Sequence, residues 1–182
     1  MRYLLIVCLI ACSAKKSEPP PPAPAAAAPP KTAATDPSTP TTAPATAVHA
    51  ADGSTVDLAS VWANKRVLLV FYMGAWCDHC KAQLAEIQKQ HDKLTADGTK
   101  IIAVSNDKPE DAAKLKADLG LGFDIYSDPD LSTSKSWGVA ASGAPNPTPY
   151  SFVIQPGGAV TYHRKGMATM DELIAAVGSG GH

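Results

Sequence analysis

Two cysteines three positions apart, Cys77 and Cys80, are the residues of this sequence with the clearest capacity for chemistry. A Cys-x-x-Cys pair can be a redox dithiol, half of a zinc site, or an accident of composition. Structural zinc usually needs four ligands, but the sequence has no second such pair and its histidines are scattered. Adjacent His79 and Cys80 cannot easily share a metal with Cys77 at a helix start. We therefore predict a redox dithiol, with no metal and no other cofactor.

The residues on both sides of the pair predict a strand, a turn and a helix. An apolar run from Val67 to Met73 stops at Gly74, and apolar residues recur with helical spacing between Lys81 and Leu94. The two thiols then lie where the helix begins. Free backbone N–H groups and the helix dipole at that point favour a thiolate, the reactive form of cysteine.

The two residues between the cysteines, Asp78 and His79, are expected to tune the redox potential. A protonated His79 would stabilise a nearby thiolate, whereas the carboxylate of Asp78 would raise the thiol pKa. The two effects are of similar size, so the sequence leaves the potential open. The alternative for His79 is a solvated residue of the turn without a redox role.

The composition excludes several classes of protein. With 182 residues, one domain plus extensions is expected, and a formal net charge of −1 gives no basic surface for nucleic acid. The other two cysteines, Cys8 and Cys12, lie near the start of the chain, so a scaffold stapled by disulfides is not expected. Roughly 130 residues remain for the folded part, enough for one hydrophobic core.

The first residues have the pattern of an export signal. Arg2 precedes a short apolar run from Tyr3 to Ala11, which is far shorter than the ~20 residues that span a bilayer. A basic start followed by a short apolar core is typical of such signals. Residues 1–11 are therefore expected to be a signal peptide.

The end of this signal, Leu9–Ile10–Ala11–Cys12, resembles the bacterial lipoprotein pattern. The resemblance implies cleavage before Cys12 and lipid on its sulfur and new amino group. The protein would then be anchored to a membrane of the cell envelope, with its domain facing the periplasm or the cell exterior. A secretory signal with an incidental cysteine is the alternative.

Residues 12–47 are expected to form a tether. The stretch from Ser17 to Ala47 is almost entirely Pro, Ala and Thr and holds ten of the sixteen prolines. Such a segment has few donors and little to bury, so it cannot form a packed core. Its extended length would be on the order of 100 Å at ~3 Å per residue. A proline-rich ligand for a partner domain is the alternative.

Alternating strand and helix patterns predict one domain over residues 48–177, with a flexible tail at 178–182. Asp52–Gly53 between two short runs predicts a hairpin, and the later alternation requires parallel crossovers in a sheet. After the hairpin we expect a short helix at 58–62 and strands at 67–73, 101–104, 123–126, 150–154 and 159–163. Helices are expected at 81–94, at 108–119, from the turn at 127–130 to residue 138, and at 169–177.

With Trp76 before the pair, this stretch resembles the active site of the thioredoxin superfamily, whose pattern is strand–W–C–x–x–C–helix. Val70–Phe71–Tyr72 and Gln83–Leu84 are more similar to the membrane-tethered thiol reductases and to the alkyl hydroperoxide reductase/thiol-specific antioxidant group. The resemblance covers about residues 48–177. It implies an α/β thioredoxin-like fold: a central mixed sheet flanked by helices, with an N-terminal hairpin and a helix–strand insertion.

The resemblance also implies roles for particular residues. Cys77 would be the exposed nucleophile, and Cys80, one helical turn further, would resolve the mixed disulfide. A proline that is cis in the superfamily precedes the strand facing the dithiol, and Pro149 occupies that place. Thr148 before it would offer its backbone to an extended substrate.

The sequence departs from the related families at several positions. Peroxiredoxins carry P-x-x-x-[TS]-x-x-C with the peroxide-reactive cysteine last, which here would be Cys80. Met73 and Cys77 then stand where the proline and the hydroxyl residue belong, and Pro149 stands where those proteins have an arginine. The buried carboxylate of thioredoxin, six residues before the first cysteine, is here Phe71.

Three functions remain open from the sequence. The first is a lipid-anchored thiol–disulfide oxidoreductase outside the cytoplasm, which acts on protein dithiols or disulfides and needs an electron donor that this chain does not encode. The second is a thiol peroxidase with Cys80 as the peroxidatic cysteine. The third is a tethered module whose cysteines are incidental or hold copper.

Overall fold

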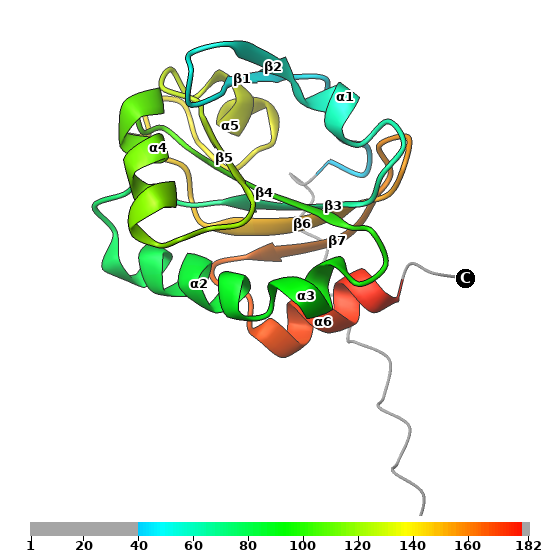
Figure 1. Cartoon of the computed structure of the whole chain (residues 1–182). Coiled ribbons are helices and arrows are strands. Elements are labelled where there is room, and N and C mark those ends of the chain that lie inside the picture. Colours follow the sequence, from blue (N-terminus) through cyan, green and yellow to red (C-terminus); the bar gives the residue numbers. More distant parts are fainter. Residues whose placement is uncertain (1–39, 180–182) are drawn as a thin grey trace, which may run out of the picture.

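A computed structural model describes residues 40–179, which form a seven-stranded mixed sheet with helices on both faces (Figure 1). The strand order is β2-β1-β5-β4-β3-β6-β7, and β4 runs parallel to β3 and β5. The strands are β1 (Ala47–His49), β2 (Thr55–Asp57), β3 (Val67–Phe71), β4 (Lys100–Ser105), β5 (Asp124–Ser127), β6 (Tyr150–Ile154) and β7 (Val160–Lys165). The helices are α1 (Leu58–Val61), α2 (Asp78–Lys89), α3 (His91–Thr95), α4 (Pro109–Asp118), α5 (Ser132–Ser136) and α6 (Met170–Gly178).

Two hydrophobic cores lie on opposite faces of the sheet. Side chains alternate along β3, so Leu68 and Val70 enter one core and Leu69 and Phe71 enter the other. The first core is closed by α2, α3, α4 and α6, and it contains both cysteines of the dithiol. The second is closed by α1 and by the segment that carries Trp137, whose ring centroid lies 4.8 Å from that of Phe152.

Local sequence signals account for several helix and strand ends. The hairpin around Asp52–Gly53 forms as predicted, with β1 antiparallel to β2. The final helix begins with a capping box, in which the Glu172 amide donates to Thr169 Oγ1 at 3.3 Å and the Thr169 amide donates to Glu172 Oε2 at 2.9 Å. The expected single helix over 81–94 instead begins at Asp78 and is interrupted at Gln90, whose backbone leaves helical geometry (φ −101°, ψ 12°).

The folded part extends further toward the N-terminus than the sequence indicates. Thr42 forms a bridge with Ala159, and the Ala43 amide donates to the Gly158 carbonyl at 2.7 Å. The domain therefore includes residues that we had assigned to the tether 12–47. Cys12, the predicted signal peptide, most of the predicted tether and residues 180–182 lie outside the described part of the chain. Within residues 40–179, no helix is long and apolar enough to cross a membrane.

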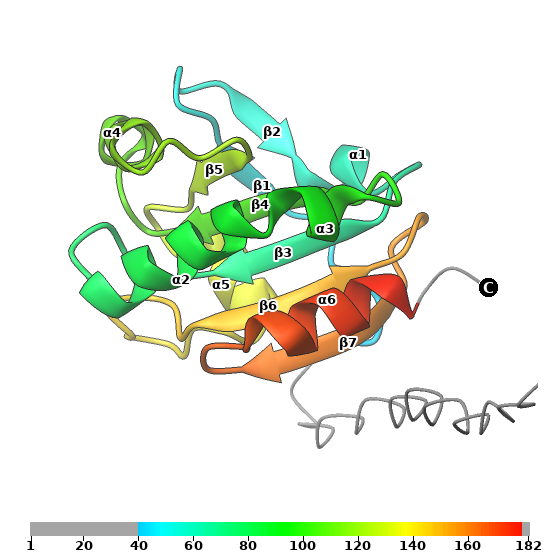
Figure 2. The ribbon, with the colours of Figure 1, turned by 60° about the horizontal axis from the view of Figure 1, so that its bottom comes forward.

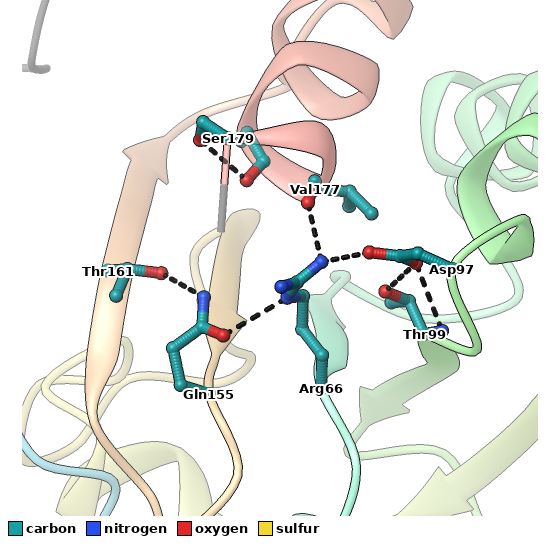
Figure 3. Close-up of polar contacts among 8 residues, drawn as sticks. Arg66, Asp97, Thr99, Gln155, Thr161, Val177 and Ser179 are labelled. Atoms are coloured by element: carbon teal, nitrogen blue, oxygen red, sulfur yellow. Dashed lines mark hydrogen bonds and ion pairs between the residues drawn. The ribbon is translucent and has the colours of Figure 1, made fainter. Parts of the chain in front are cut away.

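Arg66, which directly precedes β3, forms hydrogen bonds to three separate segments of the chain at this end of the sheet (Figure 3). The Arg66 guanidinium pairs with the Asp97 carboxylate and donates to the Val177 carbonyl at 2.8 Å and to Gln155 Oε1 at 3.1 Å. Burial opposes ionisation of Asp97, but hydrogen bonds from Thr99 and the charge of Arg66 hold its pKa below the ordinary 3.8. The contribution of the ionised carboxylate to stability is thus present above that value and is lost as the pH falls below it.

We expect Arg66→Ala to lower the free energy of unfolding by about 2 kcal/mol, because three acceptors lose a charged donor. Urea unfolding followed by circular dichroism measures this loss. Arg164→Ala is the matched control, since Arg164 lies 3.9 Å from Glu172 with both side chains about two-fifths exposed, a pair worth less than about 1 kcal/mol. If both variants lost the same free energy of unfolding, the hydrogen bonds of Arg66 would not be specially stabilising and the prediction would be wrong.

Candidate functional site

Cys77 and Cys80 form a disulfide at the first turn of α2, with their Cα atoms 5.2 Å apart. Cys77 is the N-cap of the helix, and its sulfur accepts a hydrogen bond from the Cys80 amide at 3.2 Å. Cys77 is 8% exposed and Cys80 only 1%. Cys77 thus lies at the helix start and Cys80 one turn inside, as the sequence predicts. Cys77 is buried, however, whereas the resemblance implies an exposed residue.

A tight turn carries the chain from β3 to the dithiol. The Cys77 amide donates to the Gly74 carbonyl at 3.1 Å, and Gly74 has φ 141°, a conformation that favours glycine. A Cβ at this position would stand 2.7 Å from the indole nitrogen of Trp76. The indole therefore lies against the glycine backbone, and it remains 62% exposed beside the disulfide.

Asp107, which follows β4, anchors this turn. Its Oδ2 accepts from the Ala75 amide at 2.8 Å and from the Ser105 hydroxyl at 2.7 Å. The sequence alone gives Asp107 no role in the site. The signal that could have found it is topological: the carboxyl ends of parallel neighbours such as β3 and β4 meet at one edge of the sheet.

Tyr72 lies behind the dithiol in the same core as the two cysteines. It is 1% exposed, and its hydroxyl makes no hydrogen bond although Ser105 and Asp107 are close. Burial raises the pKa of Tyr72, and the negative charge of Asp107 raises it further. The phenol is therefore neutral near pH 7. Phe71, which stands where thioredoxin has its buried acid, faces the opposite core.

A lysine compensates the carboxylate between the cysteines. Lys81 Nζ lies 2.7 Å from Asp78 Oδ1, and the hydrogen bond and charge of Lys81 lower the pKa of Asp78, with a smaller contribution from His79. Because this carboxylate is already paired, it opposes a Cys77 thiolate less than the sequence suggested. His79 is exposed on the first turn of α2.

Thr148 and Pro149 lie at the same edge of the sheet as the dithiol, since β6 places Tyr150 opposite Phe71. The Thr148 amide donates to the Val139 carbonyl at 2.7 Å, and the Pro149 carbonyl accepts from the Gly166 amide at 2.8 Å. The described residues contain no cis peptide bond, so Pro149 is trans here and differs from the cis proline of the superfamily, an isomer that the sequence leaves open.

The site has the elements of thiol chemistry. Among residues 40–179, no group of three His, Cys, Asp or Glu side chains is arranged to hold a metal ion. Hollows flank the dithiol on both sides, one of about 560 Å³ reaching from Trp76 toward α4 and one of about 320 Å³ between His79 and Met167. A capped sulfur near the surface with a second sulfur directly behind it can exchange disulfides.

Comparison with known proteins gives the family and the fold. The sequence model described as the AhpC/TSA family matches residues 40–163. Among solved structures, peroxidoxin BcpB from Mycobacterium tuberculosis aligns with a TM-score of 0.71 at 18% identity, over 79% of this chain and 98% of that chain. At such an identity the likeness concerns the fold alone, and it confirms the predicted thioredoxin-like architecture.

Two curated relatives represent two activities. A protein of Mycobacterium tuberculosis named as a peroxiredoxin is 34% identical over 96 residues, covering 53% of this chain and 60% of the relative. The thiol-disulfide oxidoreductase ResA of Oceanobacillus iheyensis is 29% identical over 123 residues, covering 67% of this chain and 60% of ResA. The matched region thus spans less than two thirds of either relative's length.

We expect Asp107→Ala to destabilise the protein by about 2 kcal/mol, because the Ala75 amide and the Ser105 hydroxyl lose their acceptor. Asp107→Asn keeps an amide oxygen as acceptor and should recover more than half of this loss. Urea unfolding measures both variants, and hydrogen exchange reports the Ala75 amide directly.

Asp52→Ala is the control for this experiment. Asp52 also accepts from one backbone amide and one serine hydroxyl, both of Ser54, but in an exposed turn. Its loss should cost less than about 1 kcal/mol. An Ala75 amide that stays protected in Asp107→Ala would show that another contact holds the turn.

Proposed function

The chain belongs to the AhpC/TSA family of oxidoreductases, and on this premise we propose that it is a thiol–disulfide oxidoreductase working through Cys77 and Cys80. The observation that carries the proposal is the order of the two sulfurs. Cys77 lies at the helix start with 8% exposure and Cys80 lies behind it with 1%. An incoming sulfur reaches Cys77 first, which is the arrangement of a nucleophile backed by a resolving thiol.

The proposed exchange begins with the Cys77 thiolate. It attacks one sulfur of a substrate disulfide, so a Cys77–substrate bond forms, the substrate disulfide breaks, and a substrate thiolate leaves and takes up a proton. The deprotonated sulfur of Cys80 then attacks Cys77, forms the Cys77–Cys80 disulfide, and releases the second substrate thiol. The substrate gains two electrons and the dithiol loses them, and a separate thiol reductant would restore the dithiol.

The surroundings of Cys77 favour its thiolate. The Cys80 amide donates to its sulfur, the dipole of α2 favours negative charge there, and Lys81 compensates Asp78. His79, exposed in the same turn, would add a positive charge when protonated. Proton transfer at Cys80 would need a group other than a carboxylate, because Phe71 stands at the position of the thioredoxin acid. The neutral Tyr72 phenol is one polar group of the core that contains both cysteines.

A thiol peroxidase is the second candidate, supported by the 34% identity to the protein named as a peroxiredoxin. In that mechanism Cys80 would attack the peroxide oxygen, become a sulfenic acid and condense with Cys77. Against it stand Met73, Cys77 and Pro149 at the three positions where peroxiredoxins activate the peroxide. The 1% exposure of Cys80 also restricts access.

We propose that the protein acts in the cell envelope, anchored by lipid on Cys12. The support is the sequence around Cys12 and the long segment rich in Pro and Ala that follows it. An exported dithiol of this kind requires a reductant or an oxidant outside the cytoplasm, which a membrane-spanning partner or another exported thiol protein would supply.

The two mechanisms put the attacking sulfur at different cysteines, so single substitutions separate them. For disulfide exchange, Cys80→Ser should accumulate a mixed disulfide through Cys77, because nothing remains to resolve it. Cys77→Ser should lose exchange completely. Mass spectrometry after incubation with a disulfide-containing protein, with iodoacetamide trapping, detects both outcomes.

Brief treatment of the same two variants with hydrogen peroxide tests the peroxidase mechanism. We expect slow oxidation of Cys80 in Cys77→Ser, since no arginine stands at Pro149 to stabilise the developing charge. Fast sulfenic acid formation at Cys80, together with an inert Cys77 in Cys80→Ser, would overturn the oxidoreductase proposal in favour of the peroxidase.

The anchor has its own prediction. Labelled fatty acid should be incorporated into the wild-type protein and not into Cys12→Ala, which should remain unprocessed or be released from membranes. Cys8→Ala is the matched control and should be labelled normally, because Val7 before Cys8 is too bulky for the cleavage site. A soluble mature protein that begins at another residue would refute the anchor.

A further inference from the structure

A groove of about 560 Å³ lies between the turn that precedes the dithiol and helix α4. Its apolar surface comes from Trp76 at one end and from Leu115 and Leu119 on α4. Trp76 is directly before Cys77 and is one of two large hydrophobic residues that are exposed in the described part of the chain. An exposed apolar side chain beside a reactive sulfur is suited to contact a partner.

The groove is long enough for a short polypeptide segment. Asp111 and Leu119 mark the two ends of its α4 side, and eight residues of helix rise roughly 12 Å. Extended chain rises about 3.3 Å per residue, so roughly four residues of a substrate fit along this side. A small peroxide would leave most of the groove empty.

The charges of the groove are unequally compensated. Its two lysines are already engaged, Lys81 with Asp78 at 2.7 Å and Lys114 with Asp118 at 2.6 Å. The carboxylate of Asp107 accepts hydrogen bonds only from neutral donors.

Asp111 adds a second uncompensated charge on the α4 side of the groove. It forms no ion pair with any described residue and lies in the exposed first turn of α4. The groove thus presents negative charge beside an aromatic face, although the whole chain is nearly neutral.

We propose that this groove holds the polypeptide that flanks the substrate's reactive cysteine, and that it favours a segment with an apolar residue and a lysine or arginine. The apolar residue would cover Trp76, and the cation would face Asp107 and Asp111. This inference rests on the proposed exchange function and specifies its substrate class. Opposite charge at an exposed rim raises the rate of productive encounter and excludes like-charged partners, and a cation is also attracted to the indole face.

The test uses two disulfide-linked peptides that differ at one position, with Lys or Glu four residues or fewer from the cysteine and Leu next to it. We expect the wild-type full-length protein to reduce the Lys peptide about twofold to fivefold faster at low salt, the effect of one exposed ion pair. The preference should shrink at high salt, where exposed charges are screened. Asp111→Lys should abolish or reverse it.

Asp92→Lys is the control, because it makes the same change of charge on the exposed start of α3, outside the groove. It should keep the wild-type preference. Equal rates for both peptides in the wild type would overturn the inference while leaving the exchange function intact. Sedimentation gives a second check. If the wild type were a dimer that Asp111→Lys dissociates, and neither peptide were preferred, a second copy of the chain would occupy the groove and the inference would be wrong.

Binding without chemistry separates the groove from the exchange function. S-methylated versions of the two peptides cannot exchange, and their binding is followed by the fluorescence of exposed Trp76, since Trp62 and Trp137 are buried. Tighter binding of the Lys peptide that Asp111→Lys removes would support the groove even if no disulfide were reduced. Absence of such a preference in binding and in rate would refute it.

Discussion

β3 hydrogen-bonds to β4 on one side and to β6 on the other, and none of its five side chains is more than 1% exposed. A strand whose side chains fill two cores cannot shift its register, because a slip of one residue would move Leu68 and Val70 into the core that contains Trp137. The point at which the chain leaves the sheet is therefore fixed at Phe71. That point also determines where the turn, the dithiol and the start of α2 lie, because they follow Phe71 directly in the chain.

Around this fixed exit, short contacts from other elements complete the site. β3 and β4 are parallel and end side by side, so Asp107, which follows β4, lies next to the turn that follows β3. Its carboxylate holds this turn by accepting a hydrogen bond from the Ala75 amide. Gly74 permits the backbone angle that lets Trp76 fold over the turn. The reactive sulfur of Cys77 is thus presented by a rigid support, with Trp76 as the exposed part.

Much of this architecture can be predicted from the sequence because it depends on interactions between residues that are close together in the chain. The capping box of Thr169 and Glu172, the hairpin at Asp52–Gly53 and the apolar run of β3 each depend on residues close together in the chain, as does the dithiol with its preceding tryptophan. The structure differs from the prediction where a contact with a residue far away in the sequence determines the local conformation. Asp107 lies thirty-two residues beyond Ala75, and the pairing of Thr42 with Ala159 joins opposite ends of the domain.

Other features had a visible but ambiguous signal. Lys81 stands at helical spacing from Asp78, yet the spacing alone does not show that the two charged groups pair. The interruption at Gln90 leaves no mark in the pattern of apolar residues, which continues through Leu94. The isomer of Pro149 depends on how its loop packs, which no local residue specifies.

The chain enters the domain at the pole opposite its reactive sulfurs. Residues 41–43 lie against the turn between β6 and β7, at the edge where β3 begins, whereas the dithiol follows the other end of β3 (Figure 2). The segment before residue 40 therefore joins the domain at the end of the sheet that lies away from the dithiol, so its point of entry does not cover the reactive cysteines.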